Sequence, residues 1–534
     1  MNRSSFVSLV AAVAVSLLLL PAQKAAAEVS IVPQPREISL KSGKAAISAN
    51  PKLYIDKKAR ISAAYAARQF GEMGITPVMV KKASEADIAI KMGKATGHKE
   101  GYTLEVGSSP AVSATADDRN GALYAIETIR QLLKPEGNGF AADACAITDW
   151  PEFGWRDFML DEARHFQGME MVKRLVDEMV RMKMNTFHWH LVDDQGWRLE
   201  IKGYPKLTSE GSLSDYDHFL LGAEKWKEAY PGRKRSYYTQ TEAKEIVRYC
   251  AERGIRVIPE IEVPGHCTVA TVVYPELQTP SDNNDDPAIY NVISPAFQKF
   301  ITTTLTQVIK IFPSKIVHIG GDEAKYDRWS KSPEYKKFMQ EHGLQTYADM
   351  QLYAINNIQK FLDKKGVKMI GWNEITGDNV HGEDNHGEAT AVSLEPGTYV
   401  QFWDGSSELA MKAIKKGFNL VNSDSRYTYL CWDIPLDRAY NFNPYFEGLT
   451  PEQNSKVLGM GCQIWGEFTP DAPRLYYWVF PRFAAHGEGG WTKPANKNYA
   501  DFIRRVAPIE RLWLKKGFFT GQKSYSLGEY QPAK

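Results

Sequence analysis

The sequence predicts an α/β fold in which a (β/α)8 TIM barrel carries the chemistry and a smaller α+β N-terminal domain precedes it. From residue 151 onward, short apolar segments alternate with amphipathic helical segments, and eight strand candidates are found. The chain has 534 residues, and a barrel takes up about 250 or more, which leaves room for a second domain. Polar residues follow the strand candidates, where a barrel builds its active site.

The composition is typical of a globular protein, with 43% hydrophobic and 24% charged residues. The net charge of +1 gives no excess that would attract nucleic acid, so we expect no nucleic-acid partner. The five cysteines are widely spaced and form no CxxC motif, which argues against a zinc or redox site. We expect buried free thiols and at most one or two disulfides.

Residues 1–27 are predicted to be a signal peptide. Arg3 is followed by the 15-residue apolar run Phe6–Leu20, which is shorter than the ~20 residues of a membrane span, and then by the small residues 25–27. An uncleaved N-terminal anchor is the alternative. We expect an exported protein, periplasmic or secreted, without an integral membrane span. The sequence does not indicate the oligomeric state.

Residues 28–150 are predicted to form the α+β N-terminal accessory domain. The segment Ile31–Pro35 is expected to be extended, because proline restricts the residue before it. Strands and helices follow from the apolar periodicity. The strands are expected at 53–55, 88–92 and 102–106, and the helices at 61–73 and 121–133. No catalytic residue types gather in this part of the chain.

Residues 151–534 are predicted to form the catalytic barrel with a short C-terminal tail. The strands are expected at 158–160, 186–191, 257–261, 316–319, 369–372, 400–403, 420–422 and 459–465. Helices are expected between them, at 169–184, 240–253, 295–312 and 348–365. A doubly wound open sheet is the structural alternative, although no GxGxxG motif follows any strand. The polar stretch 202–236 is expected to be a long loop near the site.

The sharpest chemical feature is the adjacent pair Asp322-Glu323, which follows His318 and two glycines at the end of the fourth strand. Adjacent side chains at a strand end point to different sides, so the two carboxylates can act on one substrate in different roles. A like charge and an apolar wall raise the pKa of one carboxyl toward neutrality, as a general acid needs. A solvated acidic turn is the alternative, but the paired glycines favour close approach of a ligand.

The second strand carries His188 and His190 on one face. Together with His266, His318 and Asp322 they form the alternative of a metal-dependent barrel hydrolase. No bridging lysine or further metal-spaced histidine is evident. We therefore interpret the histidines as hydrogen-bond partners that orient the carboxylates, and we predict no metal and no cofactor.

Three tryptophans end three different strands, namely Trp372, Trp403 and Trp465. Tryptophan usually fills cores. Three tryptophans at the mouth of a barrel, the end formed by the carboxyl ends of its strands, can instead enclose a methyl group or stack on the C–H groups of a sugar. Tyr429 and Glu467 are candidates for hydrogen bonds to sugar hydroxyls. Arg156 can make paired hydrogen bonds to adjacent hydroxyls.

These motifs resemble glycoside hydrolase family 20, the β-N-acetylhexosaminidases. Segment 318–323 resembles the family's signature, 185–195 its second-strand block and 258–266 its third. Segment 121–133 resembles the end of the family's N-terminal accessory domain. The resemblance covers nearly the whole chain after residue 27.

The resemblance implies a role for each matching residue. Glu323 would protonate the leaving oxygen and then activate water, and Asp322 would hold the acetamido N–H and stabilise positive charge. The substrate's own acetamido oxygen would attack C1, giving an oxazolinium intermediate and net retention. The substrate-binding residues would be Arg156 (outer hydroxyls), Trp372, Trp403 and Trp465 (acetamido methyl), Tyr429 (acetamido oxygen) and Glu467 (O4 or O6). The supporting residues would be Asp193, Asp194, His266 and His318, with a relay to Glu323.

Some positions depart from the family pattern. Asp157 stands where the family usually has glycine, and Glu262 stands where aspartate is commoner. Cys431 replaces an aspartate or asparagine, with Asp433 as a candidate substitute. The segments 202–236 and 281–290 are expected to shape the site beyond the terminal sugar.

We expect an exo-acting β-N-acetylhexosaminidase that releases terminal β-linked N-acetylglucosamine, and also N-acetylgalactosamine as an open alternative, from oligosaccharides or glycans. Three rivals stay open: a disaccharide-releasing variant similar to a lacto-N-biosidase, a metal-dependent barrel hydrolase, and a non-catalytic sugar-binding protein.

Overall fold

A computed structural model of the chain describes residues 29–107, 109–213, 216, 235–280, 288–380 and 388–518. The predicted signal peptide, most of the 202–236 stretch and residues 281–287 lie outside these ranges. Within the ranges, no helix combines the length and the apolar character needed to cross a membrane.

The N-terminal domain is built on one mixed sheet with the strand order β1-β8-β5-β6-β4-β2-β3. Its strands are β1 (Glu37–Ser48), β2 (Lys52–Ile55), β3 (Val78–Met79), β4 (Ile88–Met92), β5 (Tyr102–Val106), β6 (Val112–Ala116), β7 (Lys134–Glu136), which pairs with β8, and β8 (Gly139–Asp149). Its helices are α1 (Ala63–Gly71) and α2 (Arg119–Leu132). The expected strands β2, β4 and β5 and both helices are confirmed. The strands β6 and β8, which contain several alanines, were not predicted, because alanine has low β propensity.

The catalytic part is a closed parallel barrel with the strand order β10-β13-β14-β15-β16-β17-β18-β9. Closure rules out the open sheet, and all eight predicted strands are confirmed. They are β9 (Trp155–Asp161), β10 (Thr186–His190), β13 (Arg256–Glu260), β14 (Ile316–His318), β15 (Lys368–Trp372), β16 (Tyr399–Phe402), β17 (Asn419–Asn422) and β18 (Val457–Ile464).

Helices surround the barrel, and the four that the periodicity predicts are present as α3 (Met169–Arg181), α6 (Gln240–Glu252), α8 (Pro295–Ile311) and α11 (Tyr347–Asp363). Polar caps fix where they begin. Thr239 and Glu242 form a reciprocal capping box at α6, and Thr346 and Asp349 form another at α11. The remaining elements include β11 (Val192–Asp193), β12 (Gly196–Trp197), α4 (Lys206–Ser209), α7 (Thr268–Val273), α9 (Asp327–Lys331), α10 (Pro333–His342), α12 (Ser407–Lys415), α13 (Ser425–Thr428), α14 (Leu436–Asn441), α15 (Pro451–Asn454), α16 (Ala472–Val479), α17 (Arg482–Trp491) and α18 (Tyr499–Lys515).

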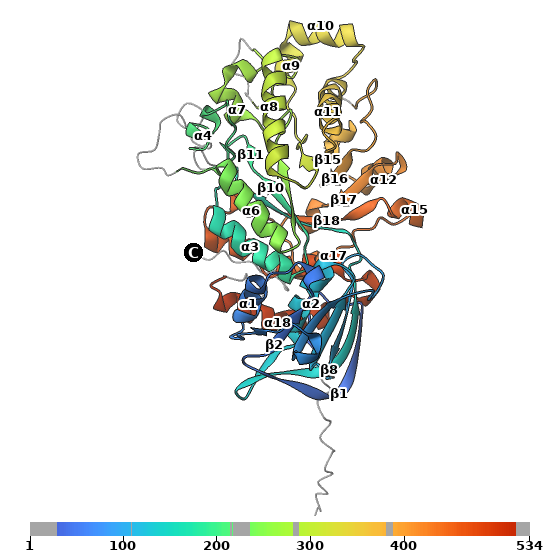
Figure 1. Cartoon of the computed structure of the whole chain (residues 1–534). Coiled ribbons are helices and arrows are strands. Elements are labelled where there is room, and N and C mark those ends of the chain that lie inside the picture. Colours follow the sequence, from blue (N-terminus) through green and yellow to red (C-terminus); the bar gives the residue numbers. More distant parts are fainter. Residues whose placement is uncertain are drawn as a thin grey trace, which may run out of the picture.

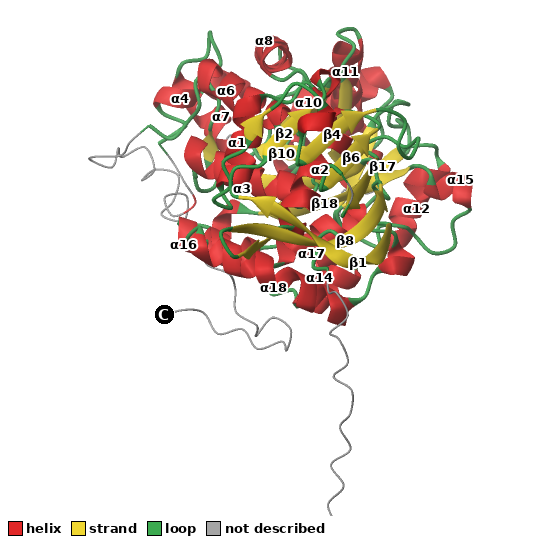
Figure 2. Cartoon of the chain, turned by 60° about the horizontal axis from the view of Figure 1, so that its bottom comes forward, coloured by secondary structure: helices red, strands yellow, loops and turns green. Residues whose placement is uncertain are grey.

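The N-terminal domain lies beneath the barrel, against the amino ends of its strands (Figure 1). Lys183, just before β10, places its Nζ 2.8 Å from Oδ2 of Asp149, and both side chains are fully buried. Seen from below, β1 and β8 lie in front with α14, α17 and α18 beside them (Figure 2). The carboxyl ends of the barrel strands face away from this contact and are free to build a site.

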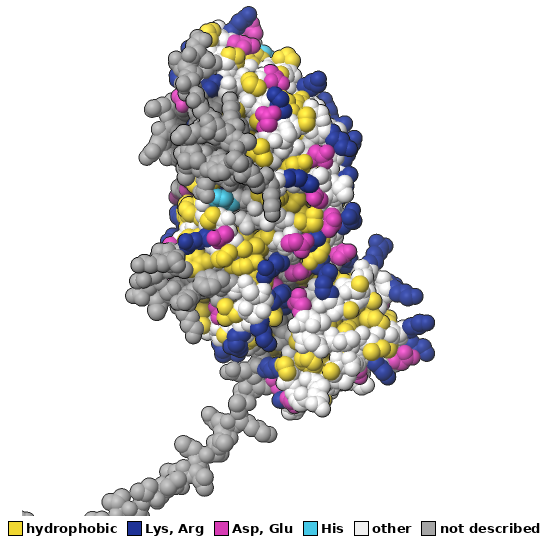
Figure 3. All heavy atoms as spheres, turned by 90° about the vertical axis from the view of Figure 1, so that its left-hand side faces the viewer, with side chains coloured by type: hydrophobic (Ala, Val, Ile, Leu, Met, Phe, Trp, Pro, Cys, Tyr) yellow, Lys and Arg dark blue, Asp and Glu magenta, His cyan; other side chains and the backbone are white. Residues whose placement is uncertain are grey.

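The cysteines and the surface charges agree with the sequence expectations. All five cysteines are buried and free, as expected. On the face shown in Figure 3, lysine and arginine side chains are interspersed with aspartate and glutamate, so neither sign dominates there.

Candidate active site

The carboxyl ends of neighbouring barrel strands bring the polar residues of the sequence motifs to one level. His190 at the end of β10 pairs with Asp161 of β9 on one side and with Glu260 of β13 on the other. Glu260 pairs in turn with His318 of β14. The strand register therefore places these four side chains around one end of the barrel.

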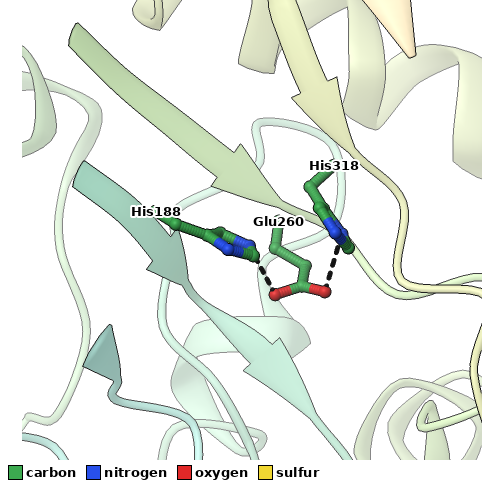
Figure 4. Close-up of side chains that lie close together, drawn as sticks. All are labelled: His188, Glu260 and His318. Atoms are coloured by element: carbon green, nitrogen blue, oxygen red, sulfur yellow. Dashed lines mark ion pairs between the residues drawn. The ribbon is translucent and has the colours of Figure 1, made fainter. Parts of the chain in front are cut away.

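Glu260 is the centre of this level. Its Oε1 accepts a hydrogen bond of 2.9 Å from Nε1 of Trp372 and lies 2.8 Å from Nδ1 of His318. Its Oε2 lies 2.8 Å from Nε2 of His188 and contacts Nδ1 of His190. Figure 4 shows His188 and His318 converging on the carboxylate from the two neighbouring strands. Burial opposes the charged form, but His318, His190 and His188 lower the pKa of Glu260 well below its usual range.

His190 links this centre to the mouth, because its Nε2 lies 2.9 Å from Oδ2 of Asp193. Both ring nitrogens thus contact carboxylates, which favours the imidazolium form. Burial alone would lower the pKa of His190, but Glu260 and Asp193 raise it to about 10. Burial lowers the pKa of His318 to about 4. The side chains below the mouth of the barrel therefore include a charged histidine, His190, and a neutral one, His318.

The metal alternative can be tested on this geometry. His188, Glu260 and His318 lie close enough together to hold an ion, as do His190, Glu260 and Glu262. However, both oxygens of Glu260 already contact N–H groups, and His190 is cationic beside them. A metal ion would have to displace these contacts and sit beside a positive charge. The geometry favours the orienting role for the histidines.

A chain of alternating acids and bases runs from Asp193 to the predicted catalytic pair. Nδ1 of His266 lies 3.3 Å from Oδ1 of Asp193 and 3.1 Å from Oδ2 of Asp194. Its Nε2 lies 3.6 Å from Oδ2 of Asp322 and 3.4 Å from Oε2 of Glu323. Burial opposes the charge of His266, but Asp193 and Asp322 raise its pKa well above the usual value. Both aspartates of the predicted support therefore contact His266.

Asp322 and Glu323 differ in their surroundings. Only 9% of the Asp322 side chain is exposed, against 51% of that of Glu323. Burial raises the pKa of Asp322 well above its usual range, Glu374 and Glu260 raise it further, and His266 opposes this shift. Glu323 and His266 both adopt positive φ angles, 44° and 45°, which are rare for residues other than glycine. Such strain concentrates at functional sites.

Four aromatic rings form a closed cycle beside this pair. Trp372 lies 6.5 Å from Trp403 and 5.9 Å from Trp465, between ring centroids. Tyr429 completes the cycle at 5.8 Å from each of Trp403 and Trp465. We call these four residues the aromatic box. Burial and the charge of Asp322 raise the pKa of Tyr429 well above its usual value, so its hydroxyl stays protonated.

Family models match both parts of the chain. Residues 153–494 match the catalytic domain of glycosyl hydrolase family 20, and residues 28–150 match domain 2 of the same family. The chain belongs to glycosyl hydrolase family 20.

Relatives and solved structures agree with this family. A β-hexosaminidase of Vibrio furnissii is 32% identical over 499 residues, which cover 87% of this chain and 77% of the relative. The exo-β-N-acetylglucosaminidase of Vibrio harveyi, solved in complex with N-acetylglucosamine, superposes with a TM-score of 0.81 at 27% identity, covering 92% of this chain and 78% of that chain. The β-N-acetylhexosaminidase of Bacteroides fragilis gives a TM-score of 0.76 at 27% identity, covering 92% and 96%.

One expectation about this family 20 hydrolase is wrong: Arg156 does not lie at the mouth. It occupies the amino end of β9, where Nη1 lies 2.8 Å from Glu100 of the N-terminal domain and Nε donates to the carbonyl of Lys183 at 2.6 Å. It is 1% exposed. A side chain at the start of a barrel strand points to the end opposite the site, so Arg156 joins the two domains instead.

The arginine at the mouth is Arg164, which the sequence reasoning did not select. Its Nη1 lies 3.0 Å from Asp161, and its Nη2 lies 2.8 Å from Asp193 and 3.7 Å from Oε1 of Glu467. The guanidinium also stacks over Trp465 at 5.2 Å. Arg164 lies three residues after the carboxyl end of β9. Its position in the sequence therefore already indicates a candidate site residue, because active-site residues of a barrel follow its strands.

Two residues that depart from the family pattern, Asp157 and Cys431, are both buried. Asp157 is buried inside the barrel, 3.9 Å from Nδ1 of His188, and burial raises its pKa to about 6. A Cβ at Gly461 would lie 3.1 Å from Oδ2 of Asp157 and closer still to the side chains of Ser423 and Gln463, so the glycine leaves room for these groups. Burial raises the pKa of Cys431 to about 12, so this thiol is neutral and cannot supply a carboxylate's charge. Asp433 is exposed.

The glycines before Asp322 and Glu323 have a packing role. Gly320 has φ 62°, and a Cβ there would lie 1.6 Å from Oε2 of Glu262. Gly321 has φ 93°, and its Cβ would lie 2.4 Å from the Ile375 side chain. The side chain of Glu262 is longer than that of the aspartate that is commoner in the family. It occupies the space that the side chain of any residue other than glycine at position 320 would fill.

We predict that Gly320→Ala lowers the free energy of unfolding by about 3 kcal/mol or more, because the new Cβ overlaps the Glu262 carboxylate. Displacement of the neighbouring acids should also reduce turnover by on the order of 10²-fold. Gly343→Ala is the matched control. Gly343 has a similar φ of 67° with no atom near the Cβ position, so only the backbone cost of about 1–2 kcal/mol applies. Equal effects of the two changes in thermal unfolding and turnover would refute the packing role.

Proposed function

We propose that this chain is an exo-acting β-N-acetylhexosaminidase that releases terminal β-linked N-acetylglucosamine by a retaining, substrate-assisted mechanism. The observation that carries the proposal is the adjacent pair of carboxylates with opposite exposure, buried Asp322 and half-exposed Glu323, beside the aromatic box. The relatives named above act on, or are named for, the same class of sugar. The substrate is a carbohydrate, and the proposal specifies its terminal sugar.

Glu323 is the proposed proton donor to the leaving oxygen. Its exposed carboxyl can reach a bond that enters from solvent, and His266 at 3.4 Å can exchange charge with it as the proton moves. After the leaving group departs, the same carboxylate can activate water by the reverse transfer. The two carboxylates differ in exposure, 51% for the side chain of Glu323 against 9% for that of Asp322, so the two acids need not share one task.

Asp322 is the proposed partner of the acetamido N–H. In substrate-assisted glycoside hydrolysis the acetamido oxygen attacks C1, so no enzyme nucleophile is needed on the opposite sugar face. Burial destabilises the charge of Asp322 in the free enzyme. Positive charge that develops on the substrate favours that charge most strongly in the transition state, which is the condition for catalysis. The neutral Tyr429 hydroxyl can donate to the acetamido oxygen and direct it toward C1.

The remaining contacts favour a single terminal sugar. The apolar rings of the aromatic box suit the acetamido methyl. Arg164 and Glu467, 3.7 Å apart, provide a donor and an acceptor for adjacent hydroxyls. Arg164 thus takes the role that the sequence resemblance gave to Arg156.

We predict that Glu323→Gln slows hydrolysis of a chromogenic β-N-acetylglucosaminide by about 10²–10⁴-fold, most for poor leaving groups, because the proton donor is lost. Chelator should not affect the wild type, and the corresponding β-glucoside without the acetamido group should be nearly inert. Glu170→Gln, an exposed change on α3, is the control.

Several outcomes would contradict the proposal. Equal slowing for good and poor leaving groups would remove the acid role of Glu323. Rapid hydrolysis of the β-glucoside would remove the substrate-assisted mechanism, and loss of activity with chelator would revive the metal alternative. If the wild type does not hydrolyse this substrate but releases a disaccharide from a glycan, the disaccharide-releasing variant is favoured. Glycan binding without any hydrolysis would favour the non-catalytic sugar-binding protein.

We also propose that the protein is exported after cleavage of residues 1–27. The basic start, the apolar run and the small residues 25–27 support this proposal. Expression of the full chain in a Gram-negative host, followed by fractionation and N-terminal sequencing, should give a periplasmic or secreted protein beginning at Glu28. A chain that lacks residues 1–27 should stay in the cytoplasm. Full-length protein in the membrane fraction would instead indicate an uncleaved anchor.

A further inference from the structure

The tripeptide Trp372-Asn373-Glu374 connects two walls of the aromatic box. Trp372 ends β15 and is itself one wall, while Trp403 follows the neighbouring strand β16 and is another. Asn373 and Glu374 begin a short 3-10 helix (Asn373–Thr376) directly after β15. The proposed mechanism uses the two tryptophans, but it gives Glu374 no task.

Asn373 anchors the backbone at Trp403. Its Oδ1 accepts a hydrogen bond of 2.9 Å from the backbone N–H of Trp403, and its Nδ2 donates to the carbonyl of Asp404 at 3.1 Å. The side chain of Asn373 is buried. With the backbone held in this way, the direction of the indole ring depends on its side-chain torsions, of which χ2 is broad in tryptophan.

Glu374 holds the indole ring itself. Nε1 of Trp403 donates to both carboxylate oxygens, at 3.1 Å to Oε1 and 3.0 Å to Oε2. A hydrogen bond to a charged acceptor is roughly twice as strong as one between neutral groups. The ring of Trp403 also lies parallel to that of Tyr429, with 5.8 Å between centroids and 5° between planes. Such a stack permits rotation within the ring plane, and the contact of Nε1 with Glu374 opposes that rotation.

The angle of Trp403 decides how much room the box leaves. Its ring lies at 72° to that of Trp372, with 6.5 Å between centroids. A hydrophobic pocket discriminates against one extra methylene by about 10–200-fold, provided that its walls keep their places. A wall that can turn would admit a larger group and lose part of this discrimination.

The charge of Glu374 also acts on Asp322. Burial raises the pKa of Asp322, His266 lowers it and Glu374 raises it further. Glu374 is therefore close to the acid that is proposed to hold the acetamido N–H. One carboxylate thus acts on both the apolar and the polar side of the proposed acetamido site.

We propose that Glu374 is a positioning residue that determines the specificity for the N-acyl group: by holding the indole of Trp403, it closes the aromatic box around a methyl group and excludes longer acyl chains. This inference rests on the proposed function. Glu374 acts through Trp403 and needs no contact with the substrate.

The test compares chromogenic β-glucosaminides that carry an N-acetyl or an N-propionyl group. Glu374→Ala removes the acceptor, so the preference of kcat/KM for N-acetyl over N-propionyl should fall by about ten-fold. Glu374→Gln keeps one oxygen acceptor and should retain most of the preference. Glu395→Ala is the matched control, because this partly exposed glutamate lies between β15 and β16 and pairs with Lys360 of α11 at 3.1 Å, outside the box.

A second readout does not depend on turnover. In 15N NMR of tryptophan-labelled protein, the Nε1–H signal of Trp403 is assigned with Trp403→Phe. Its exchange with solvent should be about ten-fold faster in Glu374→Ala than in the wild type, because the carboxylate acceptor is lost. Glu395→Ala should leave this exchange rate unchanged.

The inference alone is overturned if the wild type hydrolyses the N-acetyl substrate and Glu374→Ala keeps the full preference, or if Glu395→Ala loses as much of it. Unchanged exchange of the Trp403 signal in Glu374→Ala would also overturn it. A wild type that hydrolyses neither substrate would overturn the proposed function and this inference together. Should Glu374→Ala fail to fold, Glu374→Met, which keeps the length of the side chain without an oxygen acceptor, decides the outcome.

Discussion

The geometry of the mouth depends on one buried carboxylate, that of Glu260. Burying a charge costs several kcal/mol unless partners surround it. Here His188, His190, His318 and Trp372 approach its two oxygens. They come from β10, β14 and β15, while Glu260 ends β13. One side chain therefore ties together the carboxyl ends of four strands, and the loops that carry the catalytic groups begin from this fixed level.

The charges alternate outward from this centre. Glu260 is anionic, His190 cationic, Asp193 anionic and His266 cationic, and each contacts the next. Burial opposes the charge of Asp193, but Arg164 and His266 lower its pKa. Because each member stabilises the next, the chain holds His266 against Asp322 and Glu323. That support makes the strained backbone at His266 and Glu323 sustainable.

Much of the fold could be predicted from the sequence, because most of the barrel strands contain a short apolar segment and alternate with amphipathic helices. Strands such as β8, with its alanines, could not be identified in this way, since their place is decided by sheet partners far along the chain. The pair Asp322-Glu323 was identifiable from its motif. Arg156 stands at the start of β9, and the direction of the strand therefore places it at the end of the barrel opposite the mouth.

The role of Glu260 could not be predicted from the sequence at all. It depends on the register between β10, β13 and β14, which sets three histidines at one height. The same is true of the contact between Glu374 and Trp403, which are 29 positions apart and meet because β15 and β16 are neighbours in the barrel. Both features arise from tertiary packing, for which local patterns carry no signal.

The most direct test of this account is the protonation state of His190, measured by 15N NMR on histidine-labelled protein with His190→Gln for assignment. The pKa of His190 is raised from 6.5 to about 10, so both ring nitrogens should carry protons at about pH 8. Its contribution to stability should be complete below 6.5 and lost as the pH rises through about 10. Glu260→Gln should shift this titration toward neutral pH. A neutral His190 in the wild type at about pH 8 would contradict the charged network on which the mouth is built.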